Sequence, residues 1–310
     1  MTRGTVVPVH LENGPTPPSP WFKNRENNMV KAGLVLEGGG MKGIYTAGVL
    51  DFFLDKEIVF ENIYGVSAGA CTMASYISGQ KGRAYEVMTD YLKDKHYMGF
   101  YSLLTTGDIF GADLNYNLVP NYLNPYDYEA FEKYEGNAYA VATDIESGEA
   151  VYKKLTDMHK DIDYIRASST LPLVSRNVKI DGHLYLDGGI ADSIPIKKSE
   201  ADGNVKNVVV LTKPVGYERK PEKTAAAIKL KYYKYPKVYE LMKNRHIAYN
   251  ETLKYIDEEE KAGKIFVIRP QEDMVIGRLE KDESKLRALY DEGYNETKAR
   301  YDELMEYLNR

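Results

Sequence analysis

The chain has 310 residues and a formal net charge of −5 at pH 7. This length suits one large domain or two modest ones, and a single domain of that size buries roughly 75% of the surface of its unfolded chain. The negative net charge gives no electrostatic basis for general binding to nucleic acid or to an anionic membrane.

No apolar run approaches the roughly 18 to 20 residues of a membrane-spanning helix. The N-terminus also lacks the basic start and apolar core of a secretory signal. The only cysteine, Cys71, excludes an internal disulfide. A free thiol is typical of a reducing compartment, so we expect a cytoplasmic location.

Residues 1–29 contain five prolines and no periodic apolar pattern. This composition predicts a flexible, proline-rich tail. Met29 stands just before the first strand pattern and is a candidate natural start. In that case the residues before it were added to the native chain.

From residue 31 the pattern changes to strand, tight turn and helix, and this unit occurs twice. Ala32–Leu36 and Ile58–Val66 are apolar enough for buried strands. Apolar residues at helical spacing follow the first strand from Ile44, and a helix of small residues is expected over 68–79. This alternation predicts an α/β fold with a parallel sheet.

Residues 81–135 are predicted to form helices and loops rich in aromatic side chains. The aromatic side chains of residues 97–131 are candidates for lining an acyl pocket or for packing under a cap. Strands are expected at 138–143 and 150–155, and a helix at 164–169 that Pro172 stops.

A hairpin is predicted next, because Asp181-Gly182 suits a tight turn between the strands 178–180 and 183–186. The hairpin delivers Asp187, Gly188 and Gly189. A buried strand is expected at 207–212.

Beyond Pro214 the composition becomes strongly charged. Helices are predicted near 221–233 and 236–262, a strand at 265–268, and one last helix over 282–308. A separate helical subdomain and a cap on the sheet both fit this pattern.

A candidate nucleophile lies in the second tight turn, where Gly65, Ser67 and Gly69 form a G-x-S-x-G pattern. A serine on a sharp strand-to-helix turn exposes its hydroxyl for nucleophilic attack. A purely structural glycine turn fits the same pattern, so the motif alone leaves both readings open.

The first tight turn is a run of glycines, residues 38–43 (Gly38, Gly39, Gly40, Met41, Lys42 and Gly43). Its amides, in particular those of Gly39, Gly40 and Met41, are candidate donors to the oxyanion of an acyl-transfer reaction. The same spacing matches a dinucleotide-binding turn, which requires an acidic residue at the end of the second strand. Here that strand ends at Val66 and Ser67, so we favour the oxyanion hole. Lys42 is a candidate for attracting a phosphate head group.

The base that would accept the proton of Ser67 has two candidate identities. A triad in the order serine, acid, histidine allows Asp187 with His246, although no histidine has a strand-end or glycine setting that marks it. Asp187 has such a setting, because it ends an apolar strand and precedes two glycines. A buried carboxylate has a raised pKa and can accept a proton directly from a serine.

The joint pattern of the Gly38–Gly43 turn, the Gly65–Gly69 turn and the later Asp187-Gly188-Gly189 resembles the patatin-like phospholipase family. The run from Ala167 to Pro172 is also similar to the segment that precedes the aspartate in that family. The resemblance covers about residues 31 to 213, with Lys42 in place of the arginine of many members.

This resemblance implies a three-layer α/β/α sandwich with a mainly parallel central sheet. It implies a Ser67–Asp187 dyad, an oxyanion hole at Gly38–Met41, substrate contacts at Lys42 and Gly43, and supporting glycines at 65, 69, 188 and 189. The implied domains are a catalytic domain over 30–213 and a mostly helical extension over 214–310. The implied activity is hydrolysis of lipid or lysolipid esters through an acyl-enzyme, with no cofactor.

Two further expectations concern partners. No spacing of histidine, cysteine or carboxylate residues suggests a zinc site or a calcium loop, so we expect no metal. The stretch 229–246 alternates basic residues with tyrosines. It is a candidate for transient contact with a membrane surface, and equally a solvated helix face.

Overall fold

The computed structural model of the chain describes residues 29–272 and 275–310. The tail predicted over 1–29 lies outside the described residues, except for Met29, which begins the first strand. In the described part, a single eight-stranded sheet runs through the molecule in the order β5-β6-β3-β2-β1-β7-β8, with β4 paired to β3.

The sheet is mainly parallel, as predicted. Its parallel strands are β1 (Met29–Leu36), β2 (Val59–Val66), β3 (Asn137–Asp144), β7 (Asn207–Val210) and β8 (Ile265–Ile268). The antiparallel strands lie toward one edge and are β4 (Ala150–Lys154), β5 (Val178–Ile180) and β6 (His183–Asp187).

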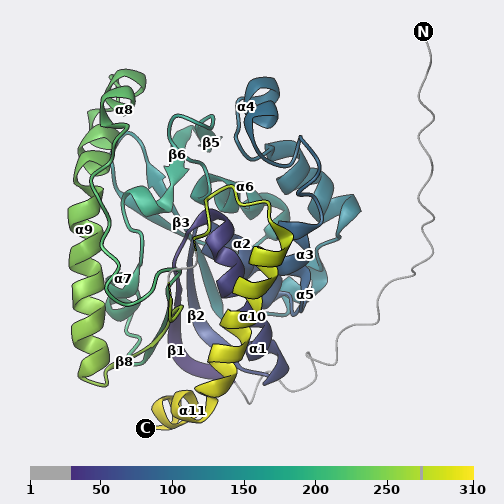
Figure 1. The fold of residues 1–310 in the computed structure, drawn as a ribbon, viewed down its shortest axis with the longest axis vertical. Helices are drawn as coiled ribbons and strands as arrows, with labels where there is room; N and C mark the ends of the chain where they lie inside the picture. Colours follow the sequence, from purple (N-terminus) through teal and green to yellow (C-terminus); the bar gives the residue numbers. More distant parts are fainter. Residues whose placement is uncertain (1–28, 273–274) are drawn as a thin grey trace.

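Helices cover both faces of the sheet and complete the three layers (Figure 1). One face carries α1 (Gly43–Asp55), α2 (Ala68–Ile77), α6 (Met158–Ser168) and α10 (Glu283–Ala299). The other carries α7 (Ile196–Ala201), α8 (Ala225–Lys231) and α9 (Pro236–Lys261). Successive strand residues point to opposite faces. Leu34 and Leu36 therefore pack in one core, and Val35 packs in the other.

Residues 81–135 form helices and loops beside α2 and α6, as expected from their sequence. The segment contains α3 (Arg83–Thr89), α4 (Phe100–Thr106), the π-helical η4 (Leu114–Leu123) and α5 (Tyr128–Glu132). Two short 3-10 turns, η3 (Gly40–Lys42) and η5 (Gly188–Ile190), follow β1 and β6.

The C-terminal part shares the sheet and the core with the rest of the chain. Strand β8 pairs with β7, and α10 lies along α1 (Figure 1). This contact needs glycine at position 48, because a Cβ there would lie 2.1 Å from the carbonyl oxygen of Tyr290. The Tyr290 hydroxyl also donates to Asp51 of α1 at 2.6 Å.

The prediction of one last helix over 282–308 was wrong, because the chain breaks at Arg300. The backbone of Arg300 leaves the helical region (φ −102°, ψ 15°), so α10 ends at Ala299 and α11 covers Tyr301–Asn309. The Arg300 guanidinium donates to the carbonyl of Val267 in β8 at 2.6 Å. The break lets both helices bury their apolar faces in the same core.

Candidate active site

Ser67 occupies a strained turn between β2 and α2. Its φ of 54° and ψ of −122° lie outside the regions that residues with a side chain normally adopt. Glycine beside it permits the tight turn, because a Cβ on Gly69 would lie 2.5 Å from the carbonyl oxygen of Leu36. The geometry is that of a serine presented at a sharp strand-to-helix turn, as the G-x-S-x-G pattern predicted.

The glycine-rich turn after β1 lies directly beside Ser67. A Cβ on Gly38 would lie 2.7 Å from the Cβ of Ser67. Within residues 29–272 and 275–310, the N–H groups of Gly38, Gly39 and Gly40 have no hydrogen-bond acceptor. The N–H of Met41 differs, because it donates to the carbonyl of Arg278 at 3.3 Å. Three adjacent amides next to Ser67 therefore remain available to an anion.

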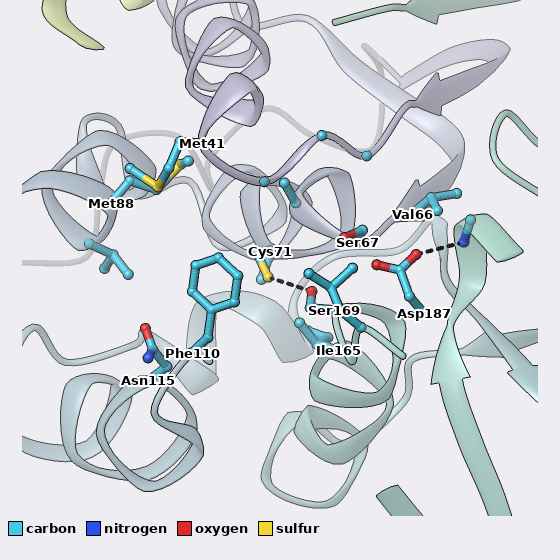
Figure 2. Close-up of a pocket in the computed structure, with 18 of the residues that line it drawn as sticks. Met41, Val66, Ser67, Cys71, Met88, Phe110, Asn115, Ile165, Ser169 and Asp187 are labelled. Carbon is cyan, nitrogen blue, oxygen red and sulfur yellow. Dashed lines mark hydrogen bonds between the residues drawn. The ribbon is translucent and has the colours of Figure 1, made fainter. Parts of the chain in front are cut away.

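Asp187 ends β6 and is buried, with 4% of its surface exposed. Its carboxylate accepts a hydrogen bond from the N–H of Gly189 at 2.8 Å, drawn as a dashed line in Figure 2. Burial raises the pKa of Asp187, while the charge of Arg245 and hydrogen bonding with the Ser67 side chain act in the opposite direction. The Ser67 and Asp187 side chains lie beside each other (Figure 2), although they are 120 positions apart in the chain.

The end of α6 holds both residues in place. The buried Ser168 hydroxyl oxygen accepts a hydrogen bond from the N–H of Ser67 at 2.8 Å. Two residues later, the carbonyl of Thr170 accepts one from the N–H of Asp187 at 2.8 Å. Both acceptors belong to the run from Ala167 to Pro172, which the sequence marked only by its resemblance to a family segment. In the structure this run fixes the backbones of Ser67 and Asp187. Because the Ser67 N–H donates to Ser168, it is not available to bind an oxyanion.

A cavity of about 190 Å³ connects these groups. Ser67, Asp187, Gly189 and the Gly38–Met41 turn line it. Most of its remaining lining is apolar and comes from the aromatic segment 83–126 and from α6, and includes Met88, Tyr97, Phe110, Val119, Tyr126 and Ile165. Several of these side chains surround the space next to Ser67 in Figure 2. The cavity thus has an apolar part on one side of Ser67.

Five residues of the predicted site do not line the cavity. Four of them, Gly43, Gly65, Gly69 and Gly188, lie where two backbone segments or a helix and a strand approach closely. The fifth, Lys42, lies near Lys213. Burial lowers the pKa of Lys213 to about 8, and the Lys42 charge acts in the same direction.

The cavity is also lined by three arginines that the sequence did not predict as site residues, Arg219, Arg245 and Arg278. All three belong to the part of the chain beyond residue 213, for which the sequence predicted no catalytic or substrate-binding residue. Arg245 had been considered only as part of a basic helix face over 229–246. Its guanidinium instead reaches Ser193, with 3.4 Å between Nη2 and Oγ. No local motif marks these positions.

Histidine contributes nothing to the cavity lining within the described residues. His159 stacks on Tyr128 with ring centroids 3.8 Å apart, and Nδ1 of His183 lies 3.2 Å from Asp144. His246 lies on α9, outside the lining, and His10 falls outside the described residues.

The described residues include no group of three or more His, Cys, Asp or Glu side chains placed to hold a metal ion. Of the helices in the same ranges, none combines the length and apolar composition that crossing a membrane requires.

Comparison with protein families matches two parts of the chain. Residues 34–198 match a family described as patatin-like phospholipase. Residues 235–309 match one described as a domain of unknown function (DUF6363). Arg245 and Arg278 fall within the second match, and Arg219 falls between the two.

Three known proteins are similar to the chain. The uncharacterized protein YjjU of Escherichia coli is 31% identical over 215 residues, which are 68% of this chain and 58% of YjjU. Lysophospholipase NTE1 of Yarrowia lipolytica is 26% identical over 179 residues, 55% of this chain but 12% of that protein. The crystal structure of VipD from Legionella pneumophila has a TM-score of 0.43 and 14% identity, over 90% of this chain and 66% of VipD. The chain thus spans less than two thirds of the curated relatives' length.

Proposed function

The chain belongs to the patatin-like phospholipase family, and on that basis we propose that it is a serine acyl hydrolase of lipid esters, of phospholipase A or lysophospholipase type. The observation that carries this proposal is the juxtaposition of Ser67 and Asp187 in a partly apolar cavity, beside three amides without acceptors. A lipid acyl chain has an apolar surface to fill there, and its ester can reach a nucleophile.

In the proposed reaction, Ser67 and Asp187 act as a dyad. The Asp187 carboxylate accepts the proton of Ser67 while Oγ forms a bond to the ester carbonyl carbon. The tetrahedral intermediate then expels the alcohol, which takes the proton from Asp187, and an acyl-enzyme remains. Water attacks the acyl-enzyme with Asp187 again as base, which releases the fatty acid and restores Ser67. Two opposing effects on the pKa of Asp187 suit its role as a base. Burial raises the pKa, which makes the carboxylate a stronger base, and the charges of Arg245 and Arg278 lower it, which favours the ionised form.

The oxyanion hole is assigned to the turn from Gly38 to Met41. The free N–H groups of Gly38, Gly39 and Gly40 support this assignment, because preorganised backbone donors stabilise a developing oxyanion. The N–H of Met41 joins them only if its bond to the Arg278 carbonyl breaks. Removing a donor of this kind typically costs about 3 kcal/mol of transition-state stabilisation.

The cavity lining favours the dyad over the two alternatives. A Ser67–Asp187–His246 triad requires an imidazole next to Asp187, and no described histidine lines the cavity. A nucleotide bound at the Gly38–Gly43 turn would share its space with Ser67 and the apolar side chains. The proposed division of the chain is a catalytic domain over 30–213 and an extension over 214–310, and we propose a cytoplasmic protein without a metal or cofactor.

Labelling of Ser67 tests this function directly. An alkyl fluorophosphonate should modify the wild-type protein at Ser67, as located by peptide mass spectrometry, and should abolish hydrolysis of p-nitrophenyl butyrate. Ser67→Ala should be neither labelled nor active, and Ser193→Ala, which alters another serine of the cavity wall, should still be labelled at Ser67. Full esterase activity in Ser67→Ala would rule out the mechanism.

A further inference from the structure

Three guanidinium groups converge on the catalytic end of the cavity. Arg219 lies in the loop after β7, Arg245 on α9 and Arg278 in the loop before α10, and all three line the same space as Ser67 and Asp187. Two of them, Arg245 and Arg278, act electrostatically on the Asp187 carboxyl. The cluster is therefore next to the reacting groups, and the family match over 34–198 contains none of its members.

Polar contacts hold the three segments in position. The backbone of Arg219 exchanges two hydrogen bonds with the Asn250 side chain, at 2.9 and 3.1 Å, and its guanidinium lies 4.4 Å from the ring centre of Tyr249. Ser193, which Arg245 contacts, donates its hydroxyl to the Gly189 carbonyl at 2.6 Å. The Arg278 carbonyl accepts the Met41 N–H. The cluster is thus built against the catalytic turns themselves.

The guanidinium groups of the cluster lack direct ion-pair partners in the part of the chain that the structure describes. Within the described residues none of the three guanidinium groups forms an ion pair, and the buried Nε atoms of Arg219 and Arg245 have no hydrogen-bond acceptor. Burial and the neighbouring arginines lower the pKa of Arg245 to about 10. Arg219 and Arg245 are partly buried and Arg278 is exposed. Buried polar donors are normally paired, so the unpaired Nε atoms of Arg219 and Arg245 favour an anionic partner in the cavity.

The carboxylates nearest the cluster are already engaged. Glu37 accepts hydrogen bonds from the Tyr249 hydroxyl and from the backbone and side chain of Thr212. Glu222 lies near Arg245 and Arg278, and its carboxylate accepts two bonds from Thr224. Asp187 is committed to Gly189 and Ser67. Asp187 and Glu222 therefore offset part of the charge of the cluster from a distance, but no carboxylate of the described residues forms a direct ion pair with its guanidinium groups.

We propose that Arg219, Arg245 and Arg278 form an anion subsite that binds the phosphate of a lysophospholipid while its acyl chain fills the apolar part of the cavity. Guanidinium groups suit this role, because their planar fork matches phosphate oxygens. The short glycerol unit between phosphate and ester would leave the ester at Ser67. The assignment rests on the proposed function and gives part of the 235–309 segment a role in the active site.

Binding to the full-length Ser67→Ala protein tests the subsite without turnover. By calorimetry below the micelle concentration, oleoyl lysophosphatidate should bind at least about tenfold more tightly than monooleoylglycerol, since charged hydrogen bonds are worth about 1.5 to 3 kcal/mol. Adding Arg219→Gln or Arg245→Gln should remove most of that difference without changing monooleoylglycerol binding. Arg219→Lys should retain part of it.

Controls separate the competing outcomes. Arg310→Gln, at an exposed arginine paired with Glu306, should change neither affinity. Equal affinity for the two lipids, or an unchanged difference in folded Arg219→Gln and Arg245→Gln proteins, would overturn the subsite. Inorganic phosphate binding as tightly as oleoyl lysophosphatidate would also overturn it as a lipid site, because the acyl chain would then add nothing.

Hydrolysis by the otherwise wild-type enzyme separates this inference from the proposed function. The ratio of kcat/KM for oleoyl lysophosphatidate to kcat/KM for monooleoylglycerol should fall about tenfold in Arg219→Gln. An unchanged ratio overturns the subsite and leaves the hydrolase intact. If the enzyme hydrolyses neither lipid nor p-nitrophenyl butyrate while Ser67→Ala shows the expected binding, the hydrolase proposal fails and the anion site stands.

Discussion

The two sides of the cavity are built in different ways. The Ser67 side consists of tight turns, in which glycines let backbones approach within contact distance. Hydrogen bonds to Ser168, at the end of α6, and to Thr170, just after it, hold Ser67 and Asp187 in place. The arginine side consists of long side chains that arrive from three separate segments of the C-terminal part. Tight turns require particular residues at particular spacings, whereas a long cation can reach the same point from many backbone positions. The following predictions test this contrast.

The largest effect is expected on the turn side, at Asp187. Asp187→Asn should lower kcat/KM for p-nitrophenyl butyrate by about 10⁴-fold, because a neutral amide cannot accept the proton of Ser67. The substitution should also stabilise the fold at pH 7. Burial raises the pKa of Asp187, so the folded state holds this proton more tightly than the unfolded chain, and the ionised carboxyl is destabilising.

The sign of that stability effect can be measured. Stability contributed by Asp187 is present below its unfolded pKa and is lost as the pH rises through the folded pKa. Urea unfolding should therefore show Asp187→Asn to be more stable than wild type at pH 7, with the difference shrinking in acid. A variant that is less stable than wild type at pH 7 would contradict the inferred cost of the buried charge.

The next largest effect is expected at Gly69. In Gly69→Ala the new Cβ would lie 2.5 Å from the Leu36 carbonyl oxygen, so the two turns must separate. We expect a loss of about 1 to 3 kcal/mol in the free energy of unfolding, typical of overpacking, together with a loss of esterase activity. Gly277→Ala is the matched control, because the nearest atom to its Cβ would be 4.0 Å away.

A smaller effect of opposite sign is expected at Ser67. The strained backbone costs a residue with a side chain on the order of 1 kcal/mol or more. Ser67→Gly should therefore be about 1 kcal/mol more stable than Ser67→Ala, although both variants are inactive. Chemical denaturation measures the difference, in which the relief of strain outweighs the larger conformational entropy that glycine loses on folding. A Ser67→Gly protein that is less stable than Ser67→Ala would show that the turn is relaxed.

The smallest effect is expected on the arginine side, in the pH dependence of a neutral ester. Arg245 opposes the raised pKa of Asp187, so Arg245→Gln should raise that pKa further. Because Asp187 acts as a base only when ionised, the acid limb of the kcat/KM profile should move to higher pH. Arg310→Gln should leave the profile where it is, and so should Arg245→Lys in large part. If Arg245→Gln leaves the acid limb unchanged, Arg245 does not influence the pKa of Asp187.

The amino-acid sequence alone was enough to predict the fold class and the residues of the tight turns around Ser67. The parallel sheet, the serine turn and Asp187 at the end of a hairpin were predicted, because glycine spacing, apolar periodicity and the Asp181-Gly182 turn act over a few residues. One error was the start of the helix predicted over 164–169, which begins at Met158. The larger error was the continuous last helix over 282–308, where a contact between Arg300 and the carbonyl of Val267 accompanies the break. That contact joins distant segments and leaves no local pattern.

Only the tertiary structure brought the arginines into the site. Arg219, Arg245 and Arg278 stand in charged surroundings that resemble any solvated surface, and nothing in their neighbours distinguishes the residue that turns inward. The packing of β8, α9 and α10 onto the sheet decides that these three charges meet beside Ser67 and Asp187. A tight turn depends on a few neighbouring residues and can therefore be predicted from the sequence. The meeting of long side chains from distant segments depends on tertiary packing and cannot.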